Sequence, residues 1–200
     1  MKPWDTFLPD VLPHCPGCPD LVAEDEIRNA AEEFLEKAFV WRYWTPAMLT
    51  ALDQTSYTPL LPAGARIVKL HEATLNNLPM YIEGVRGGDT GAAYKASTPD
   101  LKTIQVGPDA PAADLALKAR VSLSITKAST GLLDELYDAY SRQIAYGAVA
   151  RICAHADKPY SNPTKSGTER ERFLDAITNA KADKARGNSS QPMRVRGHFF

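Results

Sequence analysis

Cysteine and histidine are the residue types in this sequence best suited to metal binding or nucleophilic chemistry. Cys15 and Cys18 form a C-x-x-C, which is half of a common zinc-ligand pattern, with Cys153 and His155 as distant partners. A structural zinc site normally uses two such pairs, and a thioredoxin-like redox motif needs a strand before it. We therefore interpret residues 15–18 as a rigid turn that leads into a helix, with no metal. The odd count of 3 cysteines implies no complete disulfide framework and favours a reducing compartment.

Other candidate sites are also better explained by structure than by catalysis. The carboxylates of Glu169, Glu171, Asp175 and Asp183 lie on a predicted helix, but interspersed Arg and Lys indicate a solvated, salt-bridged face. The glycine-rich stretch 84–91 lacks the spacing of a phosphate-binding loop. The histidines form no H-x-x-x-H pair, and no nucleophile elbow is present. The sequence therefore predicts a protein that is not an enzyme and carries no cofactor.

The aromatic run Trp41-Arg42-Tyr43-Trp44 has two interpretations. It is typical of a stacking platform for single-stranded nucleic acid, or of a plug between a helix and a sheet. The formal net charge of −1 argues against a nucleic-acid surface, so we favour the plug. The composition, 44% hydrophobic and 24% charged, is that of an ordinary soluble globular protein, and no apolar run reaches membrane-spanning length.

The elements that must position these residues begin with three predicted helices, at about 19–44, 132–156 and 163–186. Apolar residues recur at spacings of three and four along each helix. Pro159 stops the second helix, and Asn162-Pro163 is an N-cap followed by proline at the first helical position. The predicted core residues are Phe34, Trp41, Trp44, Tyr140, Ile144, Phe173 and Ile177.

A sheet is predicted between the first and second helices, within 47–127. Residues 115–127 alternate between apolar and polar, and Asn76-Asn77 is expected to turn strand 66–70 back into 78–82. Residues 92–96 and 101–106 add short strands. The predicted fold is α+β: a three-helix bundle over 19–187 with an inserted small, mostly antiparallel sheet, preceded by an extended segment, 1–18.

Residues 188–200 form a predicted C-terminal arm. A polar spacer and Pro192 precede two aromatic residues at the very end of the chain. Apolar and basic residues alternate before them, which suits addition of a strand to a sheet edge on a partner. The predicted interface residues are Met193, Arg194, Val195, Arg196, Phe199 and Phe200.

The order helix, β-insert, helix–proline turn–helix and arm resembles the head-to-tail adaptor proteins of tailed bacteriophages. The likeness is greatest to the adaptors of short-tailed phages called tail tubular protein A, and it spans nearly the whole chain in layout. The segments that carry it are 8–13, 15–19, 27–34, 41–42, 60–65, 145–151, 158–160 and 172–177.

The resemblance implies a structural virion protein at the head–tail junction, made in the host cytoplasm. It implies a homo-oligomeric ring, twelve copies to match the portal, that joins the portal protein to the tail nozzle or tube. Genomic DNA would pass through without sequence-specific binding, and no membrane would be involved. The alternative is a small nucleic-acid-binding or regulatory helical domain, with Arg194 and Arg196 as a basic arm. A helix-turn-helix has a short turn and a basic second helix, whereas this hairpin has a longer turn and a second helix of mixed charge. We therefore favour the adaptor.

Overall fold

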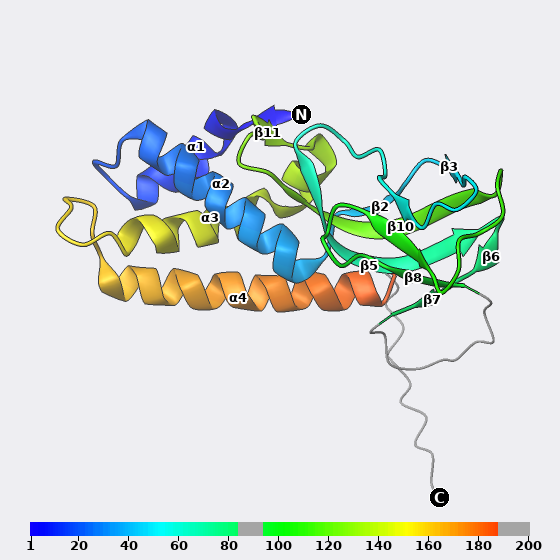
Figure 1. Ribbon diagram of the computed structural model, residues 1–200. Coiled ribbons are helices and arrows are strands. Elements are labelled where there is room, and N and C mark those ends of the chain that lie inside the picture. The colour runs from blue at the N-terminus through cyan, green and yellow to red at the C-terminus, as the bar shows by residue number, and fades with distance from the viewer. Residues whose placement is uncertain (84–93, 188–200) are drawn as a thin grey trace, which may run out of the picture.

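The computed structural model describes residues 1–83 and 94–187 (Figure 1). Helices gather at one end of the molecule and strands at the other, and the long helix α4 runs along one side toward the strands (Figure 1). The helices are α1 (Leu8–Val11), α2 (Asp20–Ala38), α3 (Asp134–Cys153) and α4 (Pro163–Ala185), with 3-10 turns at Trp4–Phe7 and Leu12–His14.

The strands form two larger sheets and one small one. A five-stranded sheet has the order β2-β10-β5-β6, with β3 also paired to β10; a four-stranded sheet has the order β4-β9-β8-β7; and β1 pairs with β11. The strands are β1 (Lys2–Pro3), β2 (Arg42–Trp44), β3 (Met48–Leu49), β4 (Ser56–Tyr57), β5 (Ala65–Leu75), β6 (Leu78–Pro79), β7 (Tyr81–Ile82), β8 (Lys95–Ser97), β9 (Ile104–Gly107), β10 (Ala116–Ile125) and β11 (Gly131–Leu132).

The chain is α+β, but the prediction of a three-helix bundle with one small sheet is wrong. The described residues contain four α-helices and several sheets. The extra sheet arises because the predicted strand 78–82 divides: Leu78–Pro79 pairs with β5, and Tyr81–Ile82 pairs in parallel with β8 of the other sheet. The turn that precedes it is as predicted, since Asn76 and Asn77 have φ of 49° and 65°, which suits a tight hairpin.

The first long helix is shorter than predicted. Helix α2 ends at Ala38, and Phe39 adopts the left-handed conformation with φ 54°, donating its N–H to the carbonyl of Leu35. The following residues 42–44 form β2, which pairs with β10. The aromatic run has no helix-breaking residue of its own, so its apolar spacing could be fitted equally to a helix or to a strand edge.

The N-terminal segment is not extended as predicted. Three short helical turns cover 4–14, and Phe7 is fully buried against the ring of Tyr137, with the ring centroids 4.8 Å apart. Trp4 donates its indole N–H to the carbonyl of Ser129 at 3.0 Å. Pro9 and Pro13 lie within the first two positions of their turns, where a missing N–H is not needed.

Helices α3 and α4 pack tightly as an antiparallel pair. The side chain of Asn162 accepts a hydrogen bond from the N–H of Lys165, and Pro163 begins α4, as the sequence predicts. The buried ring of Phe173 lies against Gly147: a Cβ at that glycine would be 2.7 Å from the ring. Gly147 is therefore the position that allows the two helices to approach this closely.

Strand β10 is buried on one face along its whole length and on both faces near its end. Leu117, Ala119 and Val121 face the core, as the alternation predicts. Ser122 and Ser124, on the predicted wet face, are also buried because α2 covers them: Ser122 donates to the carbonyl of Phe39 and Ser124 to that of Glu32.

Ion pairs join the helices to each other and to the sheet. Glu33 of α2 is the centre of one network, accepting from Arg170 at 2.6 and 2.9 Å, from Arg151 at 2.8 Å and from Lys37 at 2.6 Å. These donors hold the pKa of the Glu33 carboxyl well below its usual range, and Arg170 has the largest effect. Arg66 of β5 bonds Glu32, at 3.0 Å, and Glu36 of α2, which fixes the five-stranded sheet to the bundle.

Candidate functional site

Cys15 of the C-x-x-C contacts Cys153. Residues 15–18 are a turn before α2, as predicted, but the Sγ atoms of Cys15 and Cys153 lie 3.6 Å apart in the core. Burial, and then the hydrogen bond with Cys153, raise the pKa of the Cys15 thiol to about 12. His155 turns away from the sulfurs and contacts Glu26 at 3.1 Å. In residues 1–83 and 94–187 no group of three or more His, Cys, Asp or Glu side chains is arranged to hold a metal ion.

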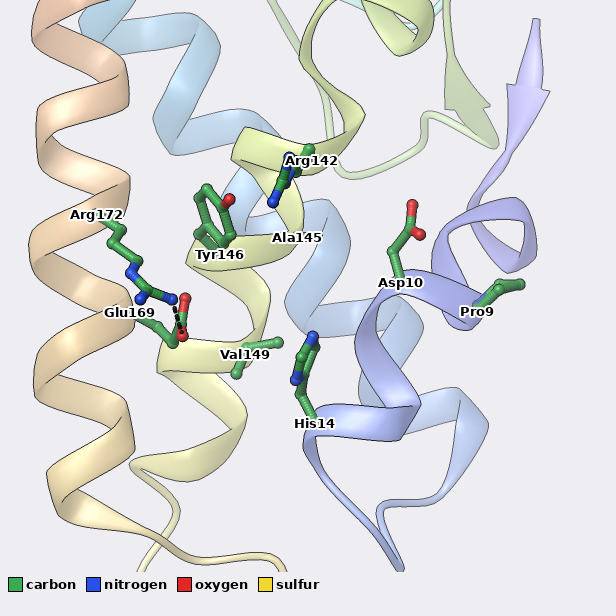
Figure 2. A pocket seen from close by; sticks show the side chains of 9 residues that line it. All are labelled: Pro9, Asp10, His14, Arg142, Ala145, Tyr146, Val149, Glu169 and Arg172. Atoms are coloured by element: carbon green, nitrogen blue, oxygen red, sulfur yellow. Dashed lines mark hydrogen bonds and ion pairs between the residues drawn. The ribbon is translucent and has the colours of Figure 1, made fainter.

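A pocket of about 360 Å³ opens between the N-terminal turns and helices α3 and α4 (Figure 2). On one side of the pocket Arg172 forms an ion pair with the buried Glu169 at 2.9 Å, and His14 and Asp10 line the opposite side (Figure 2). Arg142 lies over the ring of Tyr146, 5.9 Å from its centroid. The pocket's lining residues are Pro9, Asp10, His14, Arg142, Ala145, Tyr146, Val149, Glu169 and Arg172. This lining offers ionic contacts but contains no serine, threonine or cysteine nucleophile.

The predicted salt-bridged face of α4 is partly solvated. Glu171, Asp175 and Asp183 are exposed, whereas Glu169 is buried and held by Arg172. Of the histidines, His71 has the most altered environment. It bonds Ser122 Oγ at 2.6 Å, and burial, followed by the charges of Arg42, Lys69 and Arg120, lowers its pKa to about 4. This histidine is therefore neutral at pH 7.

The aromatic run forms only part of the predicted plug. Trp41 is buried, but Trp44 is 46% exposed, so its assignment to the core is wrong. The strand conformation of 42–44 explains this, because successive side chains of a strand point to opposite faces. The other predicted core residues lie inside: Phe34, Ile144, Phe173 and Ile177 are buried, and Tyr140 is partly buried against them, with its ring 5.2 Å from that of Phe34.

A second concave surface lies between the two larger sheets. This groove, of about 740 Å³, runs along β5 on the side away from β10. Apolar side chains dominate it, with Lys69 and Glu83 as the charged residues. Its lining is Val68, Lys69, Leu70, Ile82, Glu83, Ser97, Thr98, Pro99, Leu101 and Gln105. We call it the β5 groove.

Large exposed apolar side chains are concentrated in the strand-rich part of the chain. Between residues 44 and 101 they come from β2, β3, β6 and the connecting loops, and Leu49, Leu52, Leu60 and Leu78 are each more than two-thirds exposed. They are Trp44, Leu49, Leu52, Leu60, Leu78 and Leu101. The helices expose Leu21 and Leu174, the second of which breaks the predicted apolar stripe of α4.

Two predicted features fall outside the described residues: the glycine-rich stretch 84–91 and the arm, with Met193, Arg194, Val195, Arg196, Phe199 and Phe200. Sequence reasoning missed the Glu33 network, the Cys15–Cys153 contact and the β5 groove. Each joins segments that are distant in sequence, and period-two or period-3.6 patterns carry no signal for such pairings.

No described helix is both long and apolar enough to cross a membrane. The sequence matches no family model, and no curated protein is similar to it.

Proposed function

We propose that this chain is a structural head-to-tail adaptor of a bacteriophage virion. Twelve copies form a ring beneath the portal, bind the tail nozzle or tube protein on the other side, and line the passage for genomic DNA. The resemblance of segments such as 15–19, 145–151 and 158–160 gives the proposal its specific content.

The concentration of exposed apolar side chains in the strand-rich part is the observation that carries the proposal. Exposed large apolar side chains that gather on a surface are typical of protein–protein contacts. Trp44, Leu49 and Leu52 follow one another along the β2–β3 side of the sheet, and Leu78 extends from β6 at the opposite side. A subunit with apolar surface on both sides of its sheet suits a ring, in which each copy contacts two neighbours through different surfaces.

The ion pairs support the same role. Arg66 fixes the sheet to α2, and Glu33 links α2 to α3 and α4, so load applied at the sheet passes to the bundle through charged contacts as well as through the core. A connector between two larger assemblies needs this kind of internal rigidity.

Binding to the portal protein of the same virus is the direct test. The purified chain is mixed with preformed portal rings and sedimented, with Leu49→Lys and Leu52→Lys as interface variants and Leu174→Lys on α4 as the matched exposed-leucine control. We expect co-sedimentation of the wild type and the control at one chain per portal subunit, and reduced assembly of the sheet variants. Absence of wild-type binding would contradict the proposal.

A further inference from the structure

Strand β5 has an open edge. On one side it pairs with β10 along nearly its whole length, and on the other Thr74 and Leu75 pair with β6, while Ala73 accepts from the N–H of Met80. From Arg66 to Glu72 this second side makes no backbone hydrogen bond within residues 1–83 and 94–187. An unpaired strand edge of this length is a template for another strand.

The open edge borders the β5 groove. A register shift between Ser122 and Leu123 of β10 leaves Val68 without a partner there, and three consecutive β5 residues, Val68, Lys69 and Leu70, line the groove. Ile82 and Leu101 continue the apolar lining from the other sheet. An extended segment lying here would satisfy the backbone of β5 and bury apolar side chains at the same time, which are the two requirements of strand addition.

The β5 groove also contains an exposed carboxylate. Glu83 is exposed and makes no ion pair in the described part of the chain. Lys69, the other charged lining residue, is directed to the ring of Phe39, with its Nζ 5.2 Å from the centroid. A segment that suits this groove therefore combines apolar residues with basic ones.

The arm of this protein has that composition. Met193 and Val195 alternate with Arg194 and Arg196, and two phenylalanines follow after Gly197-His198. Residues 193–200 would span up to about 27 Å when extended, which exceeds the length of the open edge. Donor and acceptor are thus present on the same chain, so every copy offers both.

Helix α4, which precedes the arm, runs toward the strands (Figure 1). Lys181 in the last turns of α4 contacts the same Phe39 ring as Lys69, with its Nζ also 5.2 Å from the centroid. The five residues 188–192 span up to about 17 Å, a length that serves to cross to a neighbouring subunit.

We propose that the arm of one copy, residues 193–200, adds as a strand to the open edge of β5 in the next copy. Met193, Val195 and the phenylalanines occupy the β5 groove, and the two arginines face Glu83. This inference rests on the ring of the proposed function, and it names the contact that links its subunits.

Hydrogen exchange of the full chain provides the first test. The backbone amides of 66–72 are followed in the dilute protein and in the portal-bound ring. We expect these amides to exchange at least about tenfold more slowly in the ring than in the dilute protein. Equal protection at every dilution would place the arm on its own chain, and no protection in the ring would leave the edge empty; either result overturns the inference.

Charge reversal provides the second test. Glu83→Lys should weaken association between subunits by about fivefold, because an attraction becomes a repulsion. Glu171→Lys, at an exposed carboxylate of α4, is the control and should have no effect. Adding Arg194→Glu and Arg196→Glu to Glu83→Lys should restore association. If portal-bound rings form equally well in all variants, the inference fails while the proposed function stands; if the wild type forms no ring, the proposed function fails and this contact with it.

Discussion

The environment of Cys15 differs from the one that its C-x-x-C motif leads one to expect. A C-x-x-C near the surface is normally reactive because its thiolate is stabilised. Here burial raises the pKa of Cys15 to about 12, and the pKa of Cys18 is also raised by burial. Both cysteines are therefore part of the core, and Cys15 contacts Cys153 of α3.

We predict that Cys15 resists alkylation in the folded protein. At pH 8 a thiol with a pKa near 12 is almost wholly protonated, and only the thiolate reacts with iodoacetamide. Mass spectrometry of peptides after labelling should show Cys15 unmodified in native protein and modified in urea. Rapid labelling of the native protein would show that the sulfur is accessible.

We also predict that His71 makes the protein less stable in mild acid. Its pKa is about 4 when folded and about 6.5 when unfolded. Below pH 6.5 the unfolded chain therefore binds a proton that the folded chain excludes, and stability falls as the pH drops from 6.5 toward 4. Melting temperatures between pH 7 and pH 5 should decrease less steeply in His71→Gln than in the wild type. His14→Gln, at an exposed histidine, is the control, and identical slopes for wild type and His71→Gln would contradict the prediction.

At the scale of elements, the contact of α3 with α4 depends on Gly147. We predict that Gly147→Ala destabilises the fold by about 1–3 kcal/mol, because the new methyl group overpacks against Phe173. Gly167→Ala, in α4 with nothing within 4 Å of its Cβ position, should instead stabilise by about 1 kcal/mol through helix propensity. Urea denaturation midpoints measure both changes. A shift of the same sign in the two variants would mean that the helices separate easily at Gly147.

Elements with a clear local pattern could be predicted from the sequence. The alternation of 115–127 predicted β10, and Asn162-Pro163 predicted the start of α4, because both signals lie within a few residues. The end of α2 could not be predicted, since Phe39 adopts a positive φ without glycine or proline. The division of 78–82 between two sheets was missed for a related reason: it depends on β8 and β9, which lie far along the chain.

The candidate surfaces were less predictable than the elements. The arm stays a prediction from composition, and the open edge of β5 could be located only from the pairing of β5 with β10. Alternation predicts that a residue is in a strand and does not say which strand lies beside it.

In the molecule as a whole, the strand-rich end has exposed apolar residues and the open edge of β5. The helical end has ion pairs that join its helices to one another. This division suits a subunit that is rigid within itself and incomplete without neighbours. The proposed arm contact depends on the proposed ring.

Negative-stain imaging of the chain mixed with the portal tests that claim most directly. Class averages in side view should show one additional layer below the portal, and end views should show a closed ring of the portal's own symmetry around an open channel. Portal particles of unchanged outline at saturating concentrations of the folded chain would contradict the account.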